Sequence, residues 1–149
     1  MELVRKVAGF GASEDDLKTI YFLFVRSLLE QSATVWHSSL TQENSDDLER
    51  VQKSAVKIIL GQHYENYEKS LVKLEMESLH DRREFLCLKF ANKCLKNPKT
   101  KKMFPENVRI HNMETRNPEK YLVQHANTER LKNSAIIYMQ NLLNKNEHS

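Results

Sequence analysis

Apolar residues between positions 13 and 36 recur every three or four positions, which is the spacing of one face of an α-helix. This apolar stripe consists of Leu17, Ile20, Tyr21, Phe24, Val25, Leu28 and Leu29, and is extended by Ser32, Val35 and Trp36. Ser13 stands where an N-cap is needed, and Asp16 three residues later completes a near capping box. We therefore expect one continuous helix from Ser13 to Trp36 at the centre of the core, with Phe24 and Leu28 buried.

The same periodicity predicts a second long helix and a short one after it. The second long helix starts with Thr41 as its cap and ends at Gly61, and its apolar face consists of Leu48, Val51, Ala55, Ile58 and Ile59. A short helix is expected within 64–76, with Asn66 as its cap and with Leu71, Val72 and Leu74 directed inward.

A third long helix is predicted over 79–96, with Ser78 as its cap and Pro98 just beyond its end. Its core stripe consists of Leu79, Leu86, Cys87, Phe90, Ala91 and Cys94. A basic loop over 99–102 follows, and 104–128 shows no sustained periodicity. A last short helix is expected near 134–144.

These elements predict an all-α fold, because the 149 residues include only three glycines and three prolines for turns. We expect a bundle of three long helices and one short helix in a thumb-like domain over 1–97. The remaining residues, 98–149, are expected to form an irregular tail that ends in the short amphipathic helix.

Composition narrows the class of protein: 40% of the residues are apolar, 29% are charged and the net charge is +3. The longest apolar run, 20–25, is too short to span a bilayer, so no membrane partner is expected. Cys87 and Cys94 lie seven residues apart, about 10 Å along a helix, which is too far for a disulfide. Free buried thiols indicate an intracellular protein of the cytoplasm or nucleus.

The residues show no catalytic centre, metal site or cofactor motif. Two aspartate pairs, 15–16 and 46–47, stand at predicted helix starts, where the helix dipole accounts for them without metal ions. The six histidines are scattered without the spacing of a zinc site. We expect no enzyme and no cofactor.

Basic residues on two predicted helix edges are the one functional signal of the residues themselves. The first edge consists of Arg50, Lys53 and Lys57, and the second of Arg82, Lys89, Lys93 and Lys96. Such edges contact nucleic-acid phosphates or simply keep a domain soluble, and interleaved acidic residues favour solubility on pattern alone. Tyr64 and Tyr67 could stack on bases, although packing is the commoner role beside a helix start.

Several segments resemble a known family. They are Leu3-Val4-Arg5-Lys6, Phe10-Gly11-Ala12-Ser13, Phe24-Val25-Arg26, Val35-Trp36-His37, Leu48-Glu49-Arg50-Val51-Gln52-Lys53, Leu86-Cys87-Leu88-Lys89-Phe90 and Arg116-Asn117-Pro118-Glu119-Lys120-Tyr121. Together they resemble the region after the catalytic palm in reverse transcriptases (RNA-directed DNA polymerases) of jockey-like non-long-terminal-repeat retrotransposons.

The resemblance implies a thumb-like helical region that holds an RNA/DNA or DNA duplex by its backbone, with the seven basic residues above as contacts. The palm and its catalytic aspartates are absent from this sequence, so the resemblance implies a truncated fragment that does not polymerise DNA. Ser27 and Thr34 replace prolines typical of the family, which would let the first long helix run straight to Trp36.

Two other interpretations are open. The chain could be a small helical module that binds a protein partner through Trp36 and the amphipathic last helix. It could also be a folded remnant without a selected function.

Overall fold

The computed structural model describes residues 1–107 and 120–147. Every regular element in these ranges is helical, and the one backbone bridge outside the helices joins Glu106 to Tyr121. The all-α fold expected from the sequence is therefore confirmed. No helix of these ranges is both long enough and apolar enough to cross a membrane.

The chain forms two compact units, of which unit 1 comprises residues 1–33 and 40–83 and unit 2 comprises 34–39 and 84–149. This division does not coincide with the boundary at residue 97 that the sequence suggested. The helix over 79–96 contributes its first residues to unit 1 and the rest to unit 2.

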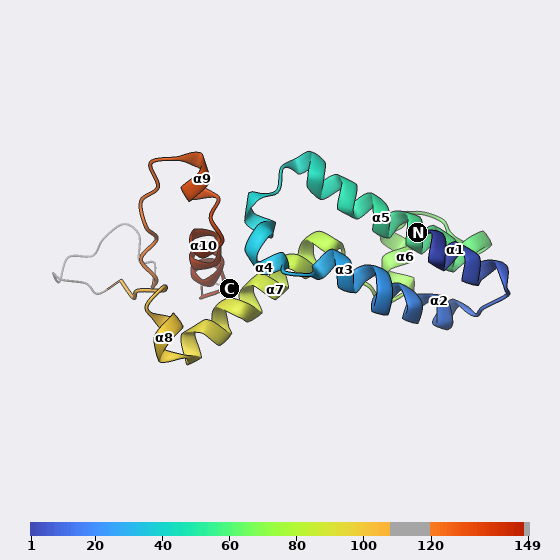
Figure 1. The fold of residues 1–149 in the computed structure, drawn as a ribbon, viewed down its shortest axis with the longest axis horizontal. Helices are drawn as coiled ribbons and strands as arrows, with labels where there is room; N and C mark the ends of the chain where they lie inside the picture. Colours follow the sequence, from blue (N-terminus) through green and yellow to red (C-terminus); the bar gives the residue numbers. More distant parts are fainter. Residues whose placement is uncertain (108–119, 148–149) are drawn as a thin grey trace. The chain divides into compact units, whose positions relative to one another are not determined.

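Unit 1 is built around its longest helix, α5, which packs against α1, α2 and α6 (Figure 1). Its complete helices are α1 (Glu2–Gly9), α2 (Glu14–Ile20), the π-helix η1 (Tyr21–Arg26), α3 (Ser27–Glu30), α5 (Gln42–Leu60), the 3-10 turn η3 (Gly61–His63) and α6 (Tyr67–Lys73). The core between them buries Val4, Leu17, Tyr21, Ala55, Val56, Ile59, Leu60, Leu74 and Met76.

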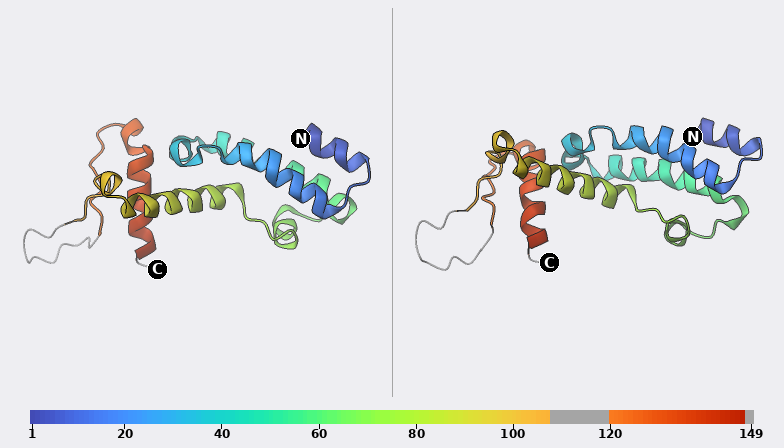
Figure 2. Two further views of the ribbon diagram at one scale, coloured as in Figure 1. Left: turned by 60° about the horizontal axis from the view of Figure 1, so that its bottom comes forward. Right: turned by 90° about the horizontal axis from the view of Figure 1, so that it is seen from below.

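Unit 2 is built where α10 crosses the C-terminal half of α7 (Figure 2). Its elements are the 3-10 turn η2 (His37–Ser39), α7 (Leu79–Lys96), α8 (Pro98–Lys101), α9 (Glu129–Lys132) and α10 (Ala135–Glu147), and α4 (Ala33–Trp36) leads into η2. The core buries Cys87, Ala91, Cys94, Phe104, Tyr121, Met139, Leu142 and Leu143. Both cysteines are buried and no disulfide joins them, as expected. The predicted basic loop at 99–102 falls largely in α8, and neither α8 nor α9 was predicted.

Helix starts follow the predicted caps. Ser13 accepts a hydrogen bond from the backbone N–H of Asp16 at 3.2 Å, within a full capping box. Thr41, Asn66 and Ser78 accept equivalent bonds at the starts of α5, α6 and α7. Gly61 ends α5 with φ 49°, in the left-handed region that favours glycine.

The expected continuous helix over 13–36 is wrong in two places. The segment Tyr21–Arg26 is a π-helix, and the chain then breaks after Glu30, where Ser32 adopts φ 55°. A π-helix takes more residues per turn than an α-helix, because its backbone hydrogen bonds reach five residues along the chain.

The π segment overturns the predicted burial of two large side chains. The inward face now falls on every fourth residue, through Leu17, Tyr21, Val25, Leu29 and Ala33. Phe24 and Leu28 are consequently 57% and 69% exposed, instead of lying in the core. Val72 and Phe90, which were also expected inside, are 79% and 43% exposed.

Candidate nucleic-acid interface

The seven basic residues predicted to contact nucleic acid are divided between the two units. Arg50, Lys53, Lys57 and Arg82 belong to unit 1, and Lys89, Lys93 and Lys96 belong to unit 2. Each group is described within its own unit.

The three basic residues of α5 are exposed and differ in their partners. Arg50 forms an ion pair with Asp47 at 2.8 Å, one helical turn away. The ammonium group of Lys53 lies 5.1 Å from the centre of the Tyr67 ring, and that of Lys57 lies 5.4 Å from the centre of the Tyr64 ring. These cation–π contacts hold both lysines over tyrosine faces without neutralising their charge.

Arg82 is held inside unit 1 by an acidic residue. Its Nε donates to the Glu30 carboxylate at 3.2 Å, and the Nε of Arg26 donates to the same oxygen at 2.6 Å. The three side chains are only 15–29% exposed, so a phosphate would compete with a partly desolvated ion pair. This pairing could not be predicted from the sequence, because Glu30 and Arg82 are 52 residues apart.

Lys89, Lys93 and Lys96 form a basic edge along α7 within unit 2. Steps of four and three residues place them on one side of the helix, and all three are exposed. Glu84, the one acidic residue of α7 in unit 2, lies five residues before Lys89, about 140° around the helix. None of the three ammonium groups forms an ion pair within the described ranges. We call this surface the lysine edge.

More lysines follow directly after the lysine edge, in α8 and just beyond its end. Lys99 and Lys102 are exposed, whereas Lys101 forms an ion pair with Glu106 at 3.1 Å. The Asn97 side chain caps α8 by accepting from the backbone N–H of Lys99 at 3.0 Å, which fixes the turn from α7 into α8.

A buried polar network in unit 1 was missed from the sequence. The amide group of Gln52 donates to the Tyr67 hydroxyl and to the Glu77 carbonyl, each at 2.9 Å. The Tyr67 hydroxyl donates in turn to the Glu49 carboxylate. The place of Gln52 in the stripe of Ala55, Val56 and Ile59 was the available signal, because a glutamine there must find partners inside the core.

This network is suited to holding the core together and not to proton transfer. Burial raises the pKa of Tyr21 well above its ordinary value, and burial together with the bond to Glu49 does the same for Tyr67. Both hydroxyls therefore stay neutral at physiological pH. Within the ranges that the structure describes, no three His, Cys, Asp or Glu side chains gather closely enough to hold a metal ion.

Each unit thus presents exposed lysines at its own surface, on α5 in unit 1 and along the lysine edge in unit 2. Comparisons with protein-family models, with curated proteins and with solved structures find no match to this chain. The resemblance to reverse transcriptases therefore stays a prediction.

Proposed function

We propose that this chain binds the phosphate backbone of RNA/DNA or DNA duplexes without sequence preference, as a non-catalytic fragment similar to a polymerase thumb. The observation that carries the proposal is the lysine edge of α7. It presents three exposed ammonium groups on one side of a single helix, with the acidic residue of that stretch turned away.

The length of the lysine edge suits several phosphates. Lys89 and Lys96 are seven residues apart, which corresponds to about 10 Å along α7. A duplex carries about one negative charge per 1.7 Å of its axis, so each ammonium group can meet its own phosphate. The contacts read no base edges, which accounts for a lack of sequence preference.

We expect the basic residues of unit 1 to contribute less to duplex binding than the lysine edge does. Lys53 and Lys57 are exposed and uncompensated by carboxylates within the described residues, so they can add phosphate contacts. To contact a phosphate, Arg50 must first break its ion pair with Asp47, and Arg82 its ion pair with Glu30. We expect Arg82 to contribute least, because its partner is the least exposed.

Salt-dependent duplex binding tests the proposal. The full chain is titrated into a labelled RNA/DNA hybrid at about 50 and 200 mM salt, beside the triple variant Lys89→Glu, Lys93→Glu, Lys96→Glu. The unaltered chain should lose affinity with salt, and the variant should bind at least about tenfold more weakly with a slope of log affinity against log salt smaller by about 2 to 3.

The matched control is Lys6→Glu, Lys69→Glu, Lys73→Glu, which makes the same change in net charge at exposed lysines of α1 and α6. It should keep most of the affinity. Equal losses in the two triple variants, or no binding at low salt, would overturn the proposal.

A second candidate function is protein binding, and one observation favours it. Leu23, Phe24 and Leu28 are 63%, 57% and 69% exposed on η1 and α3, an unusual run of uncovered large apolar side chains. Trp36 and the last helix are less suited to it than expected. Trp36 is half-buried, and α10 packs Leu142 and Leu143 into the core of unit 2.

A double variant separates the two candidates. Phe24→Ser, Leu28→Ser should leave duplex affinity unchanged if the lysine edge binds nucleic acid. A chain that fails to bind duplex at low salt, yet loses self-association or partner association in this variant by sedimentation, would support protein binding in its place.

A further inference from the structure

An open groove in unit 1 lies among α5, α6 and the first residues of α7 and has a volume of about 550 Å³. This volume is within the range of sites that hold a small ligand or a few side chains of a peptide. The groove takes no part in the proposed duplex binding, and none of the seven candidate basic residues lines it.

Negative charge dominates the wall of this groove. Five carboxylates line it, and no lysine or arginine does; they belong to Asp46, Glu49, Glu68, Glu77 and Asp81. The whole chain carries a net charge of +3, so the charge of the groove is opposite in sign to that of the chain. We call this site the acidic groove.

Neutral donors, and not cations, satisfy most of the bonded carboxylates. Asp46 accepts from the Gln42 amide at 2.8 Å, and Asp81 accepts from the Ser78 hydroxyl at 2.7 Å. Glu49 accepts from the backbone N–H of Leu79 at 3.1 Å. His80 is the one lining residue able to carry positive charge, at 3.6 Å from Asp81. These bonds hold the carboxylates in place, and within the described residues none of the five forms an ion pair with a lysine or arginine.

Apolar side chains lie between the carboxylates. Met76 is almost fully buried, Leu71 is half-buried, and Val72 is 79% exposed. Val72 shares the short helix α6 with Glu68, one turn earlier. A ligand that covers Val72 would gain apolar burial beside an acidic group.

From this pairing of charge and apolar surface we infer that the acidic groove binds a basic peptide segment of a protein partner, in which a lysine or arginine lies next to an apolar side chain. The apolar residue would cover Val72 and Leu71, and the cation would reach Glu68 and Glu77. Nucleic acid does not fit this groove, because its phosphates would face five carboxylates.

Fluorescence anisotropy with the full chain tests this inference. The probe is a short labelled peptide that alternates lysine or arginine with leucine. Two comparison peptides replace either every basic residue with glutamate or every leucine with serine. The basic peptide with leucine should bind, the acidic peptide should not, and the leucine-free peptide should bind at least about tenfold more weakly.

Variants of the protein locate the site. Glu68→Lys, Glu77→Lys should weaken peptide binding at least about tenfold, whereas the control Glu2→Lys, Asp15→Lys makes the same charge change outside the groove and should not. Val72→Ser removes apolar surface at an exposed position without changing the charge of the groove, so the fold should survive and peptide binding should weaken.

Three results would overturn the inference. They are equal losses in the groove variant and its control, equal binding of the leucine-free peptide, and displacement of the peptide by spermidine at matched charge. The last two would show that the groove attracts cations in general and recognises no peptide.

Discussion

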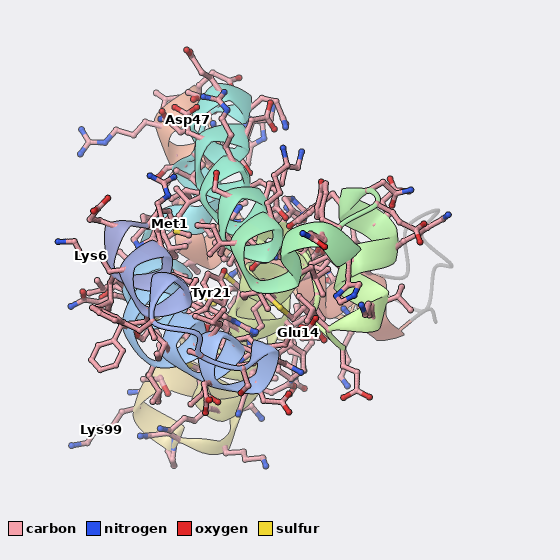
Figure 3. The ribbon with its side chains drawn as sticks, turned by 90° about the vertical axis from the view of Figure 1, so that its right-hand side faces the viewer. Met1, Lys6, Glu14, Tyr21, Asp47 and Lys99 are labelled. Atoms are coloured by element: carbon pink, nitrogen blue, oxygen red, sulfur yellow. The ribbon has the colours of Figure 1, made fainter. Side chains whose placement is uncertain are left out.

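The hydroxyl group of Tyr21 donates a 2.7 Å hydrogen bond to the side-chain oxygen of Gln52, and both side chains are fully buried. Figure 3 shows Tyr21 in the interior, whereas Lys6 and Asp47 point outward. The same glutamine reaches Tyr67 and the backbone of Glu77 through its amide nitrogen. One polar side chain therefore ties η1, α5, α6 and the approach to α7 together.

Replacing this glutamine should destabilise the fold strongly. Gln52→Leu keeps the apolar bulk but leaves the Tyr21 hydroxyl and the Glu77 carbonyl without their partner. We expect the free energy of unfolding to fall by about 2–3 kcal/mol in urea titration, the usual cost of unsatisfied buried polar groups. Gln62→Leu, at an exposed position, should stay within about 0.5 kcal/mol. If Gln52→Leu left the free energy of unfolding unchanged, the network would contribute nothing to stability.

High pH should unfold the protein through its buried tyrosines. Tyr21 and Tyr67 have pKa values raised above the ordinary 10.0, so the folded state keeps protons that the unfolded state loses. Stability is therefore fully present below about pH 10 and falls as the pH rises further, by up to about 1.4 kcal/mol per pH unit for each tyrosine. Urea midpoints between about pH 9 and 11 measure the slope. Tyr21→Phe should make it shallower, and an unchanged slope would contradict this account.

The shared ion pair of Glu30 should matter more than a surface pair. Glu30→Gln leaves Arg26 and Arg82 facing one another without their carboxylate, and all three side chains are partly desolvated. We expect a loss of about 1–2 kcal/mol in the free energy of unfolding. The control Glu65→Gln removes the exposed pair with Lys69 and should cost at most about 0.5 kcal/mol. Equal effects would place Glu30 among ordinary surface residues.

Local chemistry made some of this structure predictable. Ser13, Thr41 and Asn66 begin helices because their side chains accept bonds from backbone N–H groups three residues later, and residues of these types are recognisable in the sequence. The exposure of the lysine edge was equally predictable. Cys87, Ala91 and Cys94 mark the buried side of α7, so the lysines on the opposite side must face solvent.

The inward face of the first long helix and the contacts between distant segments could not be predicted from the sequence. The run 20–25 is apolar at every position, so it supports more than one inward face, and the pattern could not show that the helix would adopt π geometry there. The pairing of Arg82 with Glu30 likewise depends on two segments meeting across the fold. Arg82 was therefore grouped with the exposed lysines of its helix.

The π segment Tyr21–Arg26 makes the chain longer than an α-helix of the same rise requires. Removing one residue from its interior would let the remaining ones relax into α geometry, while Leu17 and Leu29 keep their places on either side. Deleting one residue disrupts the packing of most helices, because it rotates the side chains that follow. This helix can lose one residue without that rotation, because its π segment holds an extra residue. Sequences that differ in length by one residue at this point can therefore share the same packing.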